Sequence, residues 1–132
     1  MKKILIYDSS NAYLAYMKRQ FKTNYEITNY EKLEKKELKL DSYEAVIFII
    51  NNEIELVDLM YIIYASVGNL FVSTNFIELN KRLNDFENIT ILNLNKTKKG
   101  LVEQIHFGLN IFEYKKQNNK PNNKKIMSNI SN

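Results

Sequence analysis

Runs of apolar and β-branched residues recur along the chain and predict five β-strands. The strongest is the run from Ala45 to Ile50, which contains no polar residue. A continuously apolar strand implies cover on both faces, as in the middle of a parallel sheet. The predicted strands are residues 3–7, 25–29, 45–50, 70–74 and 89–94.

Segments with apolar residues at helical spacing lie between and after these strands and predict helices. Their ranges are 11–22, 30–40, 53–67, 75–83 and 97–114. In the last helix, Val102, Ile105 and Leu109 are expected to face inward. Because strands and helices alternate five times, residues 1–114 are predicted to form one α/β domain with a parallel sheet and helices on both faces.

The basic character of the chain belongs to its C-terminal end. Residues 1–114 hold 14 Lys/Arg and 15 Asp/Glu, a net charge of −1, whereas residues 115–132 hold five Lys and no acid. This Lys- and Asn-rich segment is predicted to be a disordered tail, because it has too few apolar residues to offset the entropy of ordering. It lacks Arg and aromatic residues, so a solvated tail is the preferred interpretation and nucleic-acid binding is not expected.

Residue content excludes several kinds of site. The chain has no Cys, which excludes disulfides and thiolate metal sites, and the single His106 cannot build a zinc cluster. No metal or cofactor is therefore expected. The least polar stretch, residues 59–72, is too short to cross a bilayer. We expect a cytoplasmic protein without a membrane partner.

Two strand ends resemble those of a known family. The first strand ends in Tyr7-Asp8-Ser9, an acid followed by a polar helix start, and the fourth ends in Ser73-Thr74, with a hydroxyl residue. In length and element order, residues 2–114 resemble the receiver domain of response regulators in two-component signal transduction. The resemblance implies a doubly wound (βα)5 fold of the chemotaxis-regulator type with strand order 2-1-3-4-5, an order that flavodoxins share.

The resemblance also locates a phosphoryl-acceptor pocket, and this sequence departs from its chemistry. Receivers need an acid pair after the first strand to hold Mg²⁺, a carboxylate nucleophile at the end of the third strand, and a Lys at the end of the fifth. The nucleophile's place falls on Ile49, or on Ile50 if the register shifts, and neither can be phosphorylated. We therefore expect a pseudo-receiver. Its degenerate pocket comprises Asp8, Ser9, Ile49, Thr74 and Leu94.

Asp8 has two interpretations. It is either the remnant of a metal or phosphate site, or a helix-capping acid at a strand end, where acids serve well. If Asp8 acted with Lys96, the protein would be an atypical phosphorylatable regulator. A flavodoxin-like nucleotide-binding protein is the other alternative, because the hydroxyls of Ser9 and Ser10 and the backbone amides of residues 9–11 could wrap a phosphate. That loop lacks the Gly that such close approach usually needs.

Two predicted helices carry more apolar residues than a core stripe requires, which favours contact with a partner. In residues 53–67 the expected core stripe is Leu56, Leu59, Met60, Ile63 and Val67, and a second side carries Val57, Tyr61 and Tyr64. In residues 97–114 the second side carries Phe107, Ile111 and Tyr114.

In receivers, the face formed by the fourth helix, fifth strand and fifth helix is the usual dimer or effector surface. The resemblance implies such a face here. The expected interaction residues are Lys81, Arg82, Phe107, Ile111 and Tyr114, with Tyr61 and Tyr64 beside them as further exposed aromatics. We therefore expect a non-catalytic signalling or scaffolding module that binds a protein partner or a second copy of itself, and no enzymatic activity.

Overall fold

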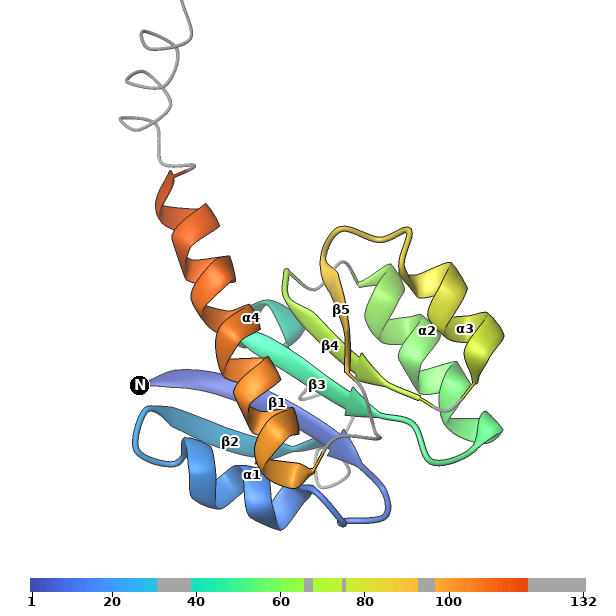
Figure 1. The fold of residues 1–132 in the computed structure, drawn as a ribbon, viewed down its shortest axis with the longest axis horizontal. Coiled ribbons are helices and arrows are strands. Elements are labelled where there is room, and N and C mark those ends of the chain that lie inside the picture. Colours follow the sequence, from blue (N-terminus) through green and yellow to red (C-terminus); the bar gives the residue numbers. More distant parts are fainter. Residues whose placement is uncertain (31–38, 66–67, 75, 93–96, 119–132) are drawn as a thin grey trace, which may run out of the picture.

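The core of the protein is a sheet of five parallel strands, drawn as arrows in Figure 1. The strands are β1 (Lys2–Asp8), β2 (Tyr25–Asn29), β3 (Ala45–Ile49), β4 (Leu70–Ser73) and β5 (Ile89–Leu92). Their order in the sheet is β2-β1-β3-β4-β5, which confirms the predicted order. This computed structural model describes residues 1–30, 39–65, 68–74, 76–92 and 97–118.

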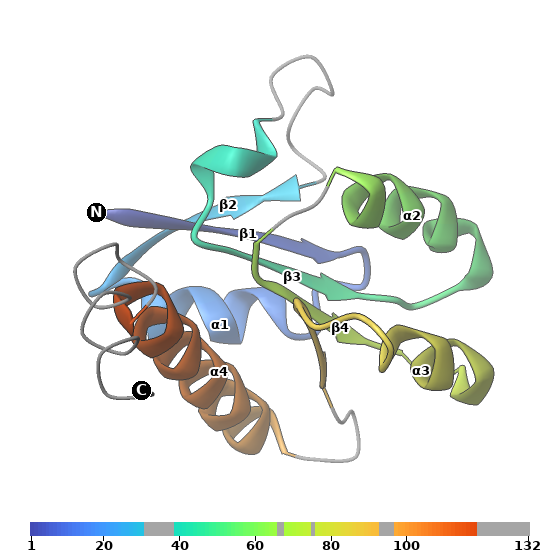
Figure 2. The ribbon, with the colours of Figure 1, turned by 90° about the horizontal axis from the view of Figure 1, so that it is seen from above.

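Helices cover both faces of the sheet. Those in the described segments are α1 (Leu14–Phe21), α2 (Leu56–Tyr64), α3 (Ile77–Leu83) and α4 (Lys98–Asn118), with two short 3₁₀ turns, η3 (Leu40–Ser42) and η4 (Glu53–Glu55). Helices α1 and α4 lie on one face, and α2 and α3 on the other (Figures 1 and 2). The α/β class is therefore confirmed. The helix predicted over 30–40 falls mainly on residues 31–38, which lie outside the described residues, so four α-helices are described rather than five.

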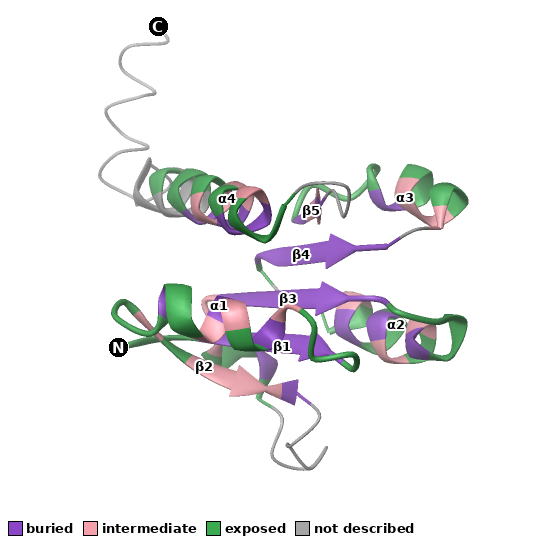
Figure 3. Cartoon of the chain, turned by 60° about the horizontal axis from the view of Figure 1, so that its bottom comes forward, coloured by how far each residue is buried: buried purple, intermediate pink, exposed green. Residues whose placement is uncertain are grey.

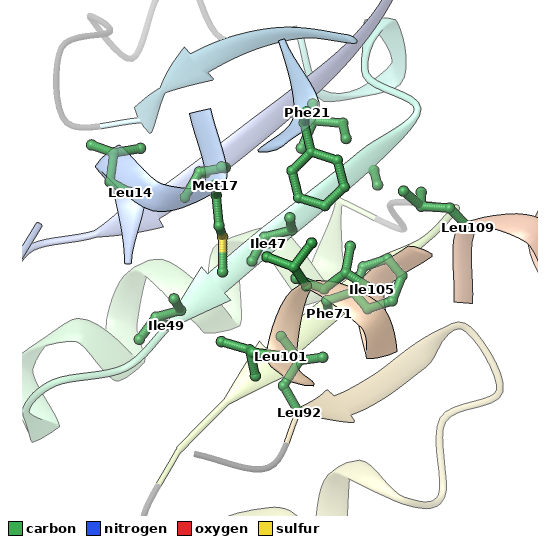
Figure 4. Close-up of a cluster of buried hydrophobic side chains, with 14 residues drawn as sticks. Leu14, Met17, Phe21, Ile47, Ile49, Phe71, Leu92, Leu101, Ile105 and Leu109 are labelled. Atoms are coloured by element: carbon green, nitrogen blue, oxygen red, sulfur yellow. The ribbon is translucent and has the colours of Figure 1, made fainter. Parts of the chain in front are cut away.

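Strand β3 is buried along its whole length, as its unbroken apolar sequence predicts. Successive side chains of a strand point to opposite faces. Ile47 and Ile49 accordingly join a cluster under α1 and α4, whereas Val46 and Phe48 join a second cluster under α2 and α3. Figure 4 shows the first cluster, in which Phe71 of β4 lies together with residues from both helices.

The ends of α1 and α4 differ from the predicted ends. Helix α1 begins at Leu14, because residues 9–13 first form a turn in which Asn11 has a positive φ of 59°. Asn tolerates this left-handed conformation better than most residues. Helix α4 follows Thr97, whose Oγ1 accepts a hydrogen bond of 3.1 Å from the Gly100 N–H as the predicted cap. It runs to Asn118, so residues 115–118 of the predicted disordered tail are helical instead, and residues 119–132 lie outside the described residues.

The rotation of α2 about its axis differs from the prediction. Met60, predicted in the core, is 46% exposed, and Ile62 is fully buried in its place beside Leu59. Leu56 and Ile63 are half-buried. None of the helices in the described segments, α2 included, is long and apolar enough to cross a membrane.

Helix α4 passes unusually close to strand β4. A Cβ atom added at Gly108 would lie 2.5 Å from Cε1 and 2.8 Å from Cζ of Phe71, distances too short for carbon atoms in contact. The Phe71 ring is fully buried between the sheet and the helix. Only a residue without a Cβ therefore lets α4 and the ring pack this closely.

Candidate functional site

The Asp8 carboxylate lies at the carboxyl end of β1, fully buried, and four donors engage it. Its Oδ2 accepts the backbone N–H groups of Tyr13 (2.8 Å) and Leu14 (3.3 Å). Its Oδ1 accepts the Ser10 hydroxyl (2.8 Å) and the Asn51 side-chain amide (3.2 Å). The first turn of a helix has N–H groups without intrahelical partners. Asp8 therefore accepts hydrogen bonds from the backbone at the start of α1, although the N-cap residue of that helix is Tyr13.

A second carboxylate, that of Glu55, lies beside it and was missed at the sequence level. Glu55 is only 4% exposed. The Ser9 hydroxyl donates to its two oxygens at 3.0 and 3.1 Å, and the backbone N–H groups of Asn51 and Asn52 donate to Oε1 at 3.1 Å each. A local signal for this role was present, because Asn52 and Glu55 are spaced as a capping box, and the structure forms it.

Asn51 joins the two carboxylates into one network. Its side-chain amide donates to Asp8, to the Ser9 Oγ at 3.1 Å and to the Ile49 carbonyl at 3.4 Å. The loops after β1 and β3 are thereby tied together at the carboxyl edge of the sheet. We call Asp8, Ser9, Asn51 and Glu55 the edge network.

Ile49 is placed beside Asp8 by the strand register. Asp8 pairs with Ile49 across β1 and β3, and Ile49 pairs with Ser73 across β3 and β4. The Ile49 side chain is 1% exposed and packs among Ile47 and other core residues under α1 and α4. Ile50, the alternative for the nucleophile's place, points into the opposite cluster and is 3% exposed. Both residues that could occupy the nucleophile's place therefore have apolar side chains packed in the core.

The remaining members of the predicted pocket lie partly within the described residues. Thr74 follows β4 and is buried, and its Oγ1 accepts the Phe76 N–H at 3.0 Å, which is a turn role. The neighbouring Ser73 hydroxyl is buried without a hydrogen-bond partner. Leu94 and Lys96 lie outside the described residues. In the described part of the chain, no three His, Cys, Asp or Glu side chains gather as ligands for one metal ion.

An aromatic cluster links the edge network to α2. Tyr7 stacks on Phe48 with ring centres 4.1 Å apart and meets the edge of Tyr30 at 4.9 Å. Its hydroxyl donates to Oδ2 of Asp58 at 3.3 Å. Burial, and then the negative charges of Glu55 and Asp58, raise the pKa of Tyr7 well above its ordinary value. Burial, Asp58 and Tyr61 raise the pKa of Tyr30 in the same direction.

The raised pKa of Tyr7 predicts a loss of stability at high pH. Above about pH 10 the phenol ionises in the unfolded chain but stays protonated in the folded one. The unfolded state then binds fewer protons, so the free energy of unfolding falls as pH rises. Urea unfolding between about pH 8 and about pH 11 should show this fall, and Tyr7→Phe should reduce its slope by up to about 1.4 kcal/mol per pH unit. Equal slopes in the two proteins would contradict the prediction.

The residues predicted for the interaction surface are all exposed, but they divide between two surfaces. One is formed by α3 and α4, and the other by α2. Phe107 (67% exposed), Ile111 (39%) and Tyr114 (68%) lie on α4, and Lys81 and Arg82 on α3. Both helices contact β5 between them, and Figure 3 shows α4, β5 and α3 along one edge of the sheet.

Tyr61 and Tyr64, by contrast, project from α2 on the sheet face opposite α4 (Figure 2). They therefore belong to a different surface from the aromatic residues of α4.

The fold and the site together define an α/β protein with a five-stranded parallel sheet and a closed hydrogen-bond network at the sheet's carboxyl edge. Comparisons of this chain with protein-family models, with curated proteins and with solved structures find no match. The carboxylates of the site, those of Asp8 and Glu55, already accept hydrogen bonds from donors of their own chain.

Proposed function

We propose that the protein is a non-catalytic pseudo-receiver, a cytoplasmic signalling or scaffolding module of the (βα)5 type that acts through protein–protein contacts. One observation carries this proposal. The carboxylate of Asp8, at the place where receivers hold Mg²⁺, is fully buried and takes four donors from its own chain.

A phosphoryl-accepting site needs opposite properties. Its carboxylates must be open to a metal ion and to the phosphoryl donor, because the metal offsets the charge that is transferred. Here, binding of Mg²⁺ at Asp8 would require breaking hydrogen bonds to the first turn of α1. The neighbouring Ile49 supplies no nucleophile, and its side chain is packed in the core. We therefore propose that this edge of the sheet holds the loops in place and transfers no group.

Contacts with a partner are proposed for the face formed by α3, β5 and α4. Phe107, Ile111 and Tyr114 give it apolar area, and Lys81 and Arg82 give it positive charge. Lys81 also lies 3.6 Å from Glu78, but both side chains are exposed, so this ion pair contributes little and leaves the Lys available. A protein partner or a second copy of the chain could bind such a face.

The absence of phosphorylation is tested with a small-molecule phosphodonor. Incubation with Mg²⁺ and acetyl phosphate should leave the intact mass unchanged, because Asp8 is already engaged by four donors and Ile49 supplies no nucleophile. Beryllofluoride with Mg²⁺ should leave the amide spectrum unchanged. A receiver that is known to accept phosphate serves as the positive control. A mass gain of one phosphoryl group would favour the atypical phosphorylatable regulator instead.

The contact face is tested by capture of partners on the immobilised protein. Phe107→Glu and Ile111→Glu should each abolish capture of proteins that the unaltered chain retains, because they place a charge within an apolar surface. Asn110→Glu is the matched control, since it adds the same charge at an exposed position of the same helix. Equal capture by all three variants would argue against a contact through α4.

A further inference from the structure

The outward side of α2 is apolar although solvent surrounds it. Ile54 in η4 is 83% exposed, and Val57, Tyr61 and Tyr64 are 73%, 56% and 78% exposed. We call these four residues the α2 seam. Leu59 and Ile62, on the other side of the same helix, are buried. A surface helix normally carries charged residues on its outward side. Residues 51–65 instead contain no Lys or Arg.

The spacing of the seam fits a helix as its partner. Its residues lie at i, i+3, i+7 and i+10, the alternation of three and four residues that forms the contact line of paired helices. Met60, 46% exposed, flanks the line. Helix α4 of the same chain lies on the opposite face of the sheet, so it does not cover the seam (Figures 1 and 2).

We propose that the α2 seam is a self-association surface on which α2 of a second copy packs antiparallel across a two-fold axis. Ile54 and Tyr64 lie five residues on either side of Leu59, and Val57 and Tyr61 lie two residues on either side. An antiparallel helix therefore sets each aliphatic residue of one copy against a tyrosine of the other. The seam matches itself, as a two-fold interface requires.

The charges near the seam favour the same orientation. In an antiparallel pair, Glu53 of each copy faces the alanine at position 65 of the other, at opposite ends of the interface. The carboxylate of Asp58 is held within its own chain by the Tyr7 hydroxyl. A parallel pair would instead bring the two Glu53 carboxylates together and align the two helix dipoles unfavourably.

The exposed area of the α2 seam indicates how strongly two copies of the chain should associate. A large aromatic side chain covers about 200 Å², so the exposed parts of the seam and Met60 amount to on the order of 500 Å² per copy. Two copies would bury roughly 1,000 Å², near the lower limit of specific interfaces. The dimer is therefore reversible. This inference does not rest on the proposed signalling role, because it uses only α2.

Sedimentation velocity over a range of micromolar concentrations tests the proposal. The unaltered chain should pass from monomer to dimer as its concentration rises. Val57→Lys and Tyr61→Glu should each raise the dimer dissociation constant at least about 30-fold, because each places a charge at the centre of the seam. Phe86→Lys, at a 45% exposed aromatic residue beyond the end of α3, is the matched control and should leave association unchanged. Circular dichroism checks that each variant is folded, as expected for exposed positions.

Mixing variants tests the antiparallel geometry. Val57→Lys mixed with Tyr61→Glu should form a heterodimer, because position 57 of one copy faces position 61 of the other. Val57→Lys mixed with Val57→Glu should not, since those positions face each other only in a parallel pair. Association of the second mixture alone would overturn the antiparallel proposal. A chain that stays monomeric throughout, or whose association survives both Val57→Lys and Tyr61→Glu, would overturn the seam itself.

Discussion

Replacing Asp8 with Ala is expected to lower the free energy of unfolding by about 3 kcal/mol, because the change leaves buried donors without an acceptor. The N–H groups of Tyr13 and Leu14 would lose their partner at the start of α1. The Asn51 amide would lose its link to the loop after β1. Asp8→Asn should have a smaller effect, since the amide keeps one of the two acceptor oxygens. Urea unfolding followed by circular dichroism measures both.

A surface acid provides the control for this result. Asp85 is exposed after α3, so Asp85→Ala should change stability by no more than about 0.5 kcal/mol. Thermal melts with Mg²⁺ distinguish a structural acceptor from a metal ligand, because a ligand that binds only the folded state raises the melting temperature. The unaltered protein should melt at the same temperature with and without Mg²⁺. A Mg²⁺-dependent rise that disappears in Asp8→Ala would mean that the carboxylate holds metal.

Gly108→Ala is expected to lower the free energy of unfolding by about 1 to 2 kcal/mol, although Ala is the better helix former. The new Cβ would overlap the Phe71 ring, whose Cε1 lies 2.5 Å from its position. The ring is fully buried and has little room to move. Asn110→Ala, an exposed substitution on the same helix, should change stability by no more than about 0.5 kcal/mol. Denaturant unfolding of the two variants provides the comparison.

A second substitution shows whether the overlap is the cause. Phe71→Leu shortens the side chain beneath α4 and should itself destabilise the core. In the Gly108→Ala background it should destabilise less, because the shorter side chain makes room for the methyl group. The two changes are then non-additive in a double-mutant cycle, as expected for residues in contact. Additive effects would mean that Gly108 matters for some other reason than its contact with Phe71.

The strands and their arrangement were largely predictable from the sequence. The unbroken apolar run that includes Ala45 to Ile49 required cover on both faces, and β3 lies in the middle of the sheet. The predicted strand order is confirmed. At the carboxyl ends of the strands the register pairs Asp8 with Ile49 and Ile49 with Ser73.

The hydrogen-bond partners of the site residues, unlike the strands, were not predictable from the sequence. Asn51 reaches Asp8 across 43 positions of sequence, and Ser9 reaches Glu55 across 46. Hydrogen bonds of this range depend on loop conformations, and no residue pattern specifies them. A buried Glu55 was also unexpected, because a charged side chain is rarely buried unless several donors compensate for its desolvation.

Residue order by itself determined the class of this protein. Apolar runs fixed where strands form, and their alternation with helical segments fixed a parallel sheet covered on both faces. The tertiary structure alone decided the rotation of α2. Apart from Asp58 that helix is apolar, so its pattern defines its rotation weakly, and packing on the sheet buried Ile62 and exposed Met60. It also decided the role of Asp8, because only the folded chain brings four donors to one carboxylate.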